Sequence, residues 1–273
     1  MKTRQELVEW CTRCSLLALA AVAFATGPAQ ADSQLSLPYP AVFGKIPAST
    51  FDVSQRRVGD ADLQIEKLDD GKVRIYSEST VDGGARAIAT ALLAPTVDGS
   101  ALRPVTQGSQ AFDLEGKSLG VMTIDHRTGE ASCARPNEDG SGTSIERLSL
   151  PENDRVANVP LNLLFDPLVK GVVSTVNFQI LLCHSGARLV DFEASVVDNQ
   201  GDQEENEHLV EVRYGPDMGS IVSMLAQAFI PRLSFWFDPA SPTPWLAHRM
   251  PLYTDGPEVL VVRQGIPTTI FIQ

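Results

Sequence analysis

The chain has 273 residues, 43% of them hydrophobic and 21% charged, and its formal net charge is −12 at pH 7. This length suffices for one domain with a substantial hydrophobic core. The acidic balance excludes nucleic acid as a partner, because phosphate binding needs clustered lysine and arginine, and it disfavours anionic lipid headgroups.

Residues 1–31 predict a cleaved secretory signal peptide. Three basic residues precede the apolar run 16–25, and Ala29 and Ala31 supply the small residues of an A-x-A cleavage site. The run is much shorter than the roughly 20 residues that cross a bilayer, so a membrane anchor is the weaker interpretation. We therefore expect a periplasmic or secreted protein that begins near Asp32 and has no transmembrane segment in its mature chain.

After a lead segment (32–50), we expect a single β-rich domain over 51–265 and a C-terminal tail over 266–273. An Asp-Gly turn at 69–71 separates two alternating segments and predicts a β-hairpin. Further glycine-containing turn signals follow at 82–84, 98–99, 115–116 and 128–129. Turns this frequent leave room for strands and none for long helices.

Three alternating segments, at 172–182, 190–196 and 210–214, predict an antiparallel meander with one wet face. The segment 233–237 also alternates and marks an edge of the sheet, and 259–262 forms a last strand. The apolar face predicted for this meander carries Val176, Phe178, Ile180, Val190, Phe192, Val210 and Val212.

Two segments predict helices. The first, 154–170, is shortened by Pro160 and Pro167 and should give one or two brief helices that end at Gly171. The second, 217–230, has one apolar helical stripe, and we expect it to pack across the apolar face of the sheet. The stripe consists of Ile221, Met224, Leu225, Ala228 and Phe229.

Together these elements predict a mainly β fold: a curved antiparallel meander sheet with one or two short helices packed on its concave face. A sheet of many strands must curl, because the twist between neighbouring strands accumulates.

The chain also contains a series of short segments whose order and spacing resemble those of a known protein family. They are the segments 58–63, 102–104, 122–125, 150–151, 166–171, 235–238, 244–249 and 255–260. This order resembles exported bacterial proteins of the domain-of-unknown-function 3108 family, over roughly residues 51–264. The resemblance implies an open half-barrel in the cell envelope, lipocalin-like or lipoprotein-carrier-like, and it carries over no catalytic residues. The chain departs from the family in Cys133 and Cys183 and in its long acidic loop.

Two cysteines remain after the signal peptide, Cys133 and Cys183. An oxidising compartment permits one intramolecular disulfide between them. Two separate thiols are the alternative, because the sequence does not show whether the two Cβ atoms are close.

No catalytic or metal-binding motif stands out. The four histidines, His126, His184, His208 and His248, show neither H-x-x-x-H nor H-x-H spacing, so we assign no metal and no cofactor. Cys183-His184-Ser185-Gly186 lacks the first glycine of a nucleophile elbow. Neighbours along a strand point to opposite faces, so Cys183 and His184 do not form a thiol–imidazole pair readily.

The acidic segment 198–207 is rich in oxygen ligands, but its glycine comes fourth, whereas the EF-hand pattern needs it sixth. Calcium binding and a solvated loop both remain open for this segment.

The sequence favours a non-enzymatic cell-envelope protein that binds a lipid, another apolar ligand or an envelope protein in its curved sheet. The candidate ligand-binding residues are Phe178, Phe192, Met224, Phe229 and Trp236. The alternatives are a structural or assembly factor whose own helices fill the sheet, and a hydrolase with a site that the sequence does not reveal. A lipid binder should have an apolar cavity of several hundred Å³, and a filled sheet should have none.

Overall fold

A computed structural model of the chain provides the structure. It describes residues 35–137, 139, 141–152, 154–184, 186–197, 208–217 and 233–271. The expected signal peptide (1–31), the acidic segment 198–207 and all but the first residue of the expected helix 217–230 lie outside these described residues.

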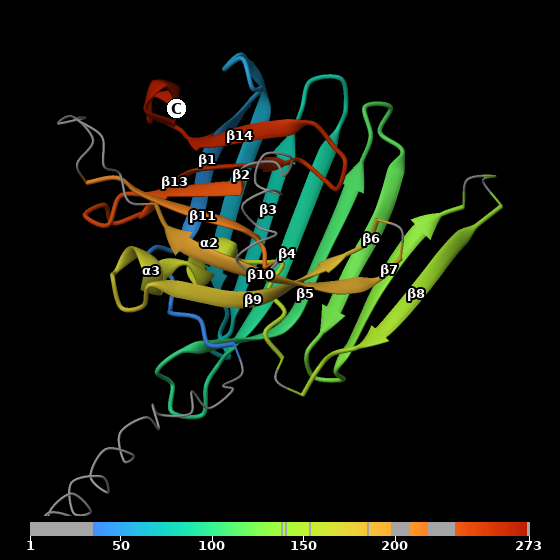
Figure 1. The fold of residues 1–273 in the computed structure, drawn as a ribbon, viewed down its shortest axis with the longest axis horizontal. Coiled ribbons are helices and arrows are strands. Elements are labelled where there is room, and N and C mark those ends of the chain that lie inside the picture. The colour runs from blue at the N-terminus through green and yellow to red at the C-terminus, as the bar shows by residue number, and fades with distance from the viewer. Residues whose placement is uncertain are drawn as a thin grey trace, which may run out of the picture. The chain divides into compact units, whose positions relative to one another are not determined.

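Within the described residues, fourteen antiparallel strands form one curved sheet (Figure 1). The first half consists of β1 (Gly44–Phe51), β2 (Arg57–Lys67), β3 (Val73–Thr80), β4 (Arg86–Pro95), β5 (Leu102–Phe112), β6 (Ser118–Asp125), β7 (Glu130–Pro136) and β8 (Thr143–Ser149). The second half consists of β9 (Thr175–Leu182), β10 (Arg188–Val196), β11 (Val210–Pro216), β12 (Leu233–Phe237), β13 (Trp245–Pro251) and β14 (Glu258–Arg263). The predicted fold class is confirmed, as is the hairpin at 69–71, which joins β2 to β3.

The strand order is β8-β7-β6-β5-β4-β3-β2-β1-β14-β13-β12-β11-β10-β9. Strands β1 and β14 therefore pair in the middle of the sheet, and Gln264 N donates to Pro47 O at the end of this pair, at 3.0 Å. The two edges are β8 and β9, which follow one another in the chain. The expectation that 233–237 marks an edge is wrong, because β14 finds its partner in β1 and leaves β12 between β11 and β13.

The β-rich unit reaches beyond 51–265 at both ends. Strand β1 begins at Gly44, inside the expected lead segment. At the other end, the short helix η1 (Thr268–Phe271) lies in the expected tail and buries Phe271 to 2% exposure.

The two halves of the sheet share one hydrophobic core. In Figure 1 the yellow and orange strands β9–β11 lie across the green and teal strands of the first half. Buried Ile75 and Leu93 from the first half belong to the same cluster as Phe178 and Phe235 from the second. The period-2 alternation of each strand supplies this core from one face of the sheet.

Two brief helices cover part of the concave face, as predicted: α2 (Leu161–Leu164) and α3 (Asp166–Val169). Phe165 lies between them, is 0% exposed, and contacts the rings of Tyr214 and Phe235 at 5.4 Å. Pro160 is the N-cap residue of α2. Pro167 lies in the first turn of α3 and has no N–H to donate back to α2, so α2 does not continue into α3. No helix in the described part of the chain is both long and apolar enough to cross a membrane.

The segment 154–159, which we call the connector, runs beside edge strand β9. Ala157 N donates to Gln179 O at 2.9 Å, and Gln179 N donates to Arg155 O at 3.0 Å. One residue further on, the Asn158 side chain accepts from Leu181 N and donates to Leu181 O, both at 2.9 Å. The connector thus satisfies backbone groups that edge strand β9 would otherwise leave unpaired.

Gln107 on β5 fastens the connector from the other side. Its Oε1 accepts from the backbone N–H groups of Asn158 and Val159 at 2.7 and 2.8 Å, and its Nε2 donates to Val156 O at 2.7 Å. Gln107 is only 3% exposed, so these bonds satisfy a buried amide. We call this junction between the β5–β8 and β9 regions the seam.

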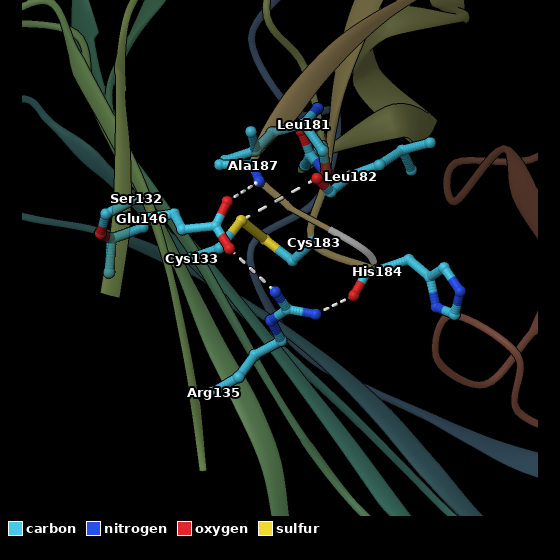
Figure 2. Close-up of a disulfide and its surroundings, with 11 residues drawn as sticks. Ser132, Cys133, Arg135, Glu146, Leu181, Leu182, Cys183, His184 and Ala187 are labelled. Carbon is cyan, nitrogen blue, oxygen red and sulfur yellow. Dashed lines mark hydrogen bonds and ion pairs between the residues drawn. A yellow bond between two sulfur atoms is a disulfide. The ribbon is translucent and has the colours of Figure 1, made fainter. Parts of the chain in front are cut away.

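A disulfide crosses the seam (Figure 2). It joins Cys133 on β7 to Cys183, the residue after β9, with the two Cα atoms 5.5 Å apart. Beside it, Arg135 donates to His184 O and, at 3.0 Å, to Glu146 Oε1. The disulfide that the sequence left open is therefore present, and it joins strands near opposite edges of the sheet.

Candidate ligand-binding cavity

A cavity of about 780 Å³ lies between the two halves of the sheet. A recess of about 130 Å³ beside the start of α2 shares wall residues with it. The shared residues are Ser77, Ser79, Ala89, Asn158, His248, Met250 and Val261.

The wall formed by β3–β6 is lined by small side chains. Two rows of cross-strand partners run along it: Ser77, Ala89, Ser109 and Met122 in one, and Ser79, Ala87, Ala111 and Gly120 in the other. Partners directly opposite one another project on the same face. Seven of these eight residues are glycine, alanine or serine, which leaves space where larger residues would fill the core.

The opposite wall is formed by β9–β14 and is built from large apolar side chains. It includes Ile180, Phe192, Leu233, Met250, Val259 and Val261. The wall formed by β9–β14 is therefore mostly hydrocarbon, with Tyr214 and His248 as polar members, whereas the β3–β6 wall also carries serine hydroxyl groups.

Ionisable residues lie around the end of the cavity near the disulfide. Arg135, His184 and Asp255 line this end, and His184 Nδ1 lies 2.6 Å from Asp255 Oδ2. Arg135 is already paired with Glu146, as Figure 2 shows. Its charge is therefore balanced within the protein.

The structure brings together two of the predicted ligand-binding residues. Phe178 and Phe192 lie on neighbouring strands with ring centroids 5.8 Å apart. Phe192 lines the cavity, whereas Phe178 packs behind it against Phe165 at 5.9 Å. Met224 and Phe229 lie outside the described residues.

Trp236, the fifth predicted residue, lies in a different cluster. Strand alternation turns Phe235 and Phe237 toward the main core and Trp236 to the opposite face. There its ring lies 5.3 Å from that of Phe271 on η1.

Two residues outside the predicted ligand-binding set, Trp245 and His248, both line the recess. His248 lies opposite Phe235 and Val261 in the strand register, with apolar neighbours on both sides. Burial lowers the pKa of His248 to about 4, so its imidazole is neutral at physiological pH. The bulge between Trp236 and Phe237 places Trp245, three residues before His248, on the same side of β13, which alternation alone would not predict.

His126 is part of a polar network at the seam. Its Nδ1 is paired with the Asp154 carboxylate, and its Nε2 lies 2.8 Å from Gln107 Nε2. The bonds to the connector fix the Gln107 amide, so its NH₂ group faces His126 and the histidine proton lies on Nδ1. An Asp–His pair orients the base of nucleophilic enzymes, but here the third group is an amide with no nucleophilic character.

Other catalytic or metal arrangements find no support in the described residues. The thiol–imidazole interpretation of Cys183 and His184 is wrong, because the Cys183 sulfur is bonded to Cys133. Nowhere in the described ranges do three or more His, Cys, Asp or Glu side chains gather as metal ligands would.

Comparison with known proteins gives a likeness in structure and none in sequence. No family model matches the chain, and no curated protein matches it. A crystal structure of a beta-barrel-like protein of domain of unknown function DUF1849 from Brucella abortus aligns with a TM-score of 0.42 and 8% sequence identity. The alignment covers 84% of this chain and 96% of that chain. The resemblance to the 3108 family stays a prediction.

Proposed function

We propose that this chain is an exported cell-envelope protein that binds an apolar, lipid-like ligand in its cavity and catalyses no reaction. The observation that carries the proposal is the cavity of about 780 Å³ with its hydrocarbon wall. Its volume falls within the usual range of small-molecule sites, and its wall is mostly apolar, as in such sites.

Apolar burial would supply the affinity. A ligand that buries about 400 Å² of apolar surface gains about 10 kcal/mol at roughly 25 cal/mol per Å², before ordering costs. Those costs are about 4 kcal/mol or more, which leaves an affinity in the micromolar range or weaker.

Two observations support export. Residues 1–31 have the pattern of a signal peptide. In addition, Cys133 and Cys183 form a disulfide, and such bonds persist in oxidising compartments such as the periplasm.

The alternative functions require features that the described residues do not favour. A sheet filled by its own helices should leave no space, yet the described residues enclose a cavity of about 780 Å³ and a recess beside the start of α2. A hydrolase needs a nucleophile next to its base, but the second nitrogen of His126 faces the Gln107 amide.

Binding can be tested with the fluorescence of N-phenylnaphthylamine, an uncharged apolar probe, added to the mature protein. Ala89→Phe places a large ring on the small-residue wall and should weaken probe binding at least about tenfold. Thr90→Phe is the matched control, because Thr90 is the next residue of β4 and is exposed. If the probe does not bind, or if both variants bind it equally well, the proposal fails. Native mass spectrometry of protein from the periplasm would show a co-purifying lipid directly.

A further inference from the structure

We propose that the recess selects ligands that carry an uncharged hydrogen-bonding group, typically a hydroxyl, held between Trp245 Nε1–H and His248 Nδ1. This inference rests on the proposed function and narrows it from any apolar ligand to a neutral amphiphile, such as a long-chain alcohol.

Both side chains offer a buried polar atom without a partner. Trp245 is 6% exposed and lines the recess together with His248. Trp245 Nε1 and His248 Nδ1 are both buried, and neither has a hydrogen-bond partner among the described residues. Most buried polar side-chain atoms in proteins are hydrogen-bonded, so two adjacent exceptions in the wall of a recess indicate a missing partner.

The two groups are held in place by their neighbours. The His248 ring stacks on Phe235 at 5.1 Å and lies 5.6 Å from the Trp245 ring. Both residues belong to β13, which pairs with strands on both sides. The polar atoms are therefore presented by a rigid wall, which lowers the entropic cost of binding.

The chemistry of the pair favours a hydroxyl group. The indole Nε1–H only donates, whereas Nδ1 of a neutral imidazole accepts in one of its two tautomers. A hydroxyl oxygen accepts from Trp245 while its proton is donated to His248, so one group satisfies both atoms. A hydrocarbon end would leave both atoms unpaired.

A carboxylate is disfavoured at this position. Burial keeps His248 neutral, with a pKa of about 4, so it supplies no positive charge near physiological pH. The recess wall also includes Asp62, whose carboxylate is paired with Lys45 at 3.1 Å. An anion desolvated beside neutral rings and a carboxylate lacks the counter-charge that burial requires.

The test measures how well three ligands with the same carbon chain displace N-phenylnaphthylamine from the mature protein. The ligands are dodecanol, dodecanoate and chlorododecane. We expect dodecanol to displace the probe with an affinity about tenfold or more above those of the other two ligands. The reason is that its hydroxyl satisfies one or both of the buried polar atoms, which the other ligands leave unpaired. This ranking on the unaltered protein needs no variant. Equal or better displacement by dodecanoate or chlorododecane overturns the inference.

Two variants test the atoms themselves. Trp245→Phe and His248→Phe keep an aromatic ring and remove the polar atom, so each should lower dodecanol affinity about tenfold and change chlorododecane affinity less than about twofold. Trp236→Phe is the matched control on the opposite face and should change neither. Retained alcohol preference in both recess variants would refute the inference while leaving the proposed function intact. Failure of the probe to bind at all would instead refute the proposed function, and this inference with it.

Discussion

Reduction of the disulfide should remove a large part of the stability of this protein. Cys133 and Cys183 are 50 residues apart in sequence. The chain-entropy model assigns a closed loop of this length about 4 kcal/mol, through restriction of the unfolded chain. Since small domains are stable by about 5–15 kcal/mol, this loss is between roughly a quarter and four-fifths of the total stability.

The measurement is urea unfolding of the mature protein, oxidised and after reduction with a phosphine. With a slope of about 2–3 kcal/mol per molar urea, a loss of 4 kcal/mol lowers the unfolding midpoint by about 1–2 M. Reduced protein keeps both sulfur atoms, so this difference reports the cross-link alone. The Cys133→Ala/Cys183→Ala double variant adds a packing loss, because Cys133 is 1% exposed.

A difference below about 1 kcal/mol between the oxidised and reduced forms would refute this reasoning. It would mean that the seam restricts the chain equally well without the bond. A preliminary control is alkylation of denatured, unreduced protein. If both cysteines were labelled, the bond would be absent and the comparison would have no basis.

Four further outcomes are expected. Burial lowers the pKa of His248 from 6.5 to about 4. As the pH falls through this range, His248 takes up a proton in the unfolded chain before it does so in the folded protein, so the free energy of unfolding should fall by up to about 3 kcal/mol. His248→Phe should flatten the dependence of this free energy on pH over the same range. Gln107→Leu leaves two connector N–H groups without a hydrogen-bond acceptor and should lower the free energy of unfolding in urea by about 2–4 kcal/mol. Gln110→Leu, at a half-buried position of the same strand, is the control and should lower it by less than about 1 kcal/mol. Phe165→Ala should lower the free energy of unfolding by about 3–5 kcal/mol in the same assay, because Phe165 is fully buried. A smaller loss would mean that the surrounding aromatic rings move in to fill the space that the Phe165 ring leaves. N-terminal sequencing of protein from the envelope fraction should begin at or near Asp32, and an intact Met1 would contradict cleavage.

Local features of the fold could be predicted because they depend on neighbours in sequence. The alternation of 172–182 and 190–196 predicted β9 and β10, and an Asp-Gly pair predicted the hairpin between β2 and β3. Pro160 and Pro167 predicted that the helical segment would be broken into short pieces. Each of these signals acts within a few residues, through side-chain periodicity or backbone restriction.

Long-range features could not be predicted in this way. The pairing of β1 with β14 depends on which distant strand is left without a partner, and β1 carries a proline that weakens its strand signal. The disulfide depended on whether Cys133 and Cys183 meet in space, which a single sequence does not show.

The cavity was harder still to foresee. Its small-residue wall comes from serines and alanines such as Ser77 and Ala89, which have no strong hydrophobic signal of their own. Their effect appears only when cross-strand register places them in rows. The pairing of Trp245 with His248 in the recess was hidden for a related reason, because strand alternation places residues three apart on opposite faces and the bulge beside Trp236 brings both to one side.

The strand order also bears on how the chain folds. Among the described strands, every pairing joins neighbours in sequence except that of β1 with β14. Such local hairpins have low contact order and form early, so β1 to β8 can assemble before the second half of the chain is available. Until β14 arrives, β1 exposes an unpaired edge, which invites pairing with another chain. Pro47 lies on this edge: its carbonyl faces Gln264, so the N–H that it lacks would have pointed the same way. A proline there makes β1 a poor template for aggregation during the interval in which the chain is most vulnerable.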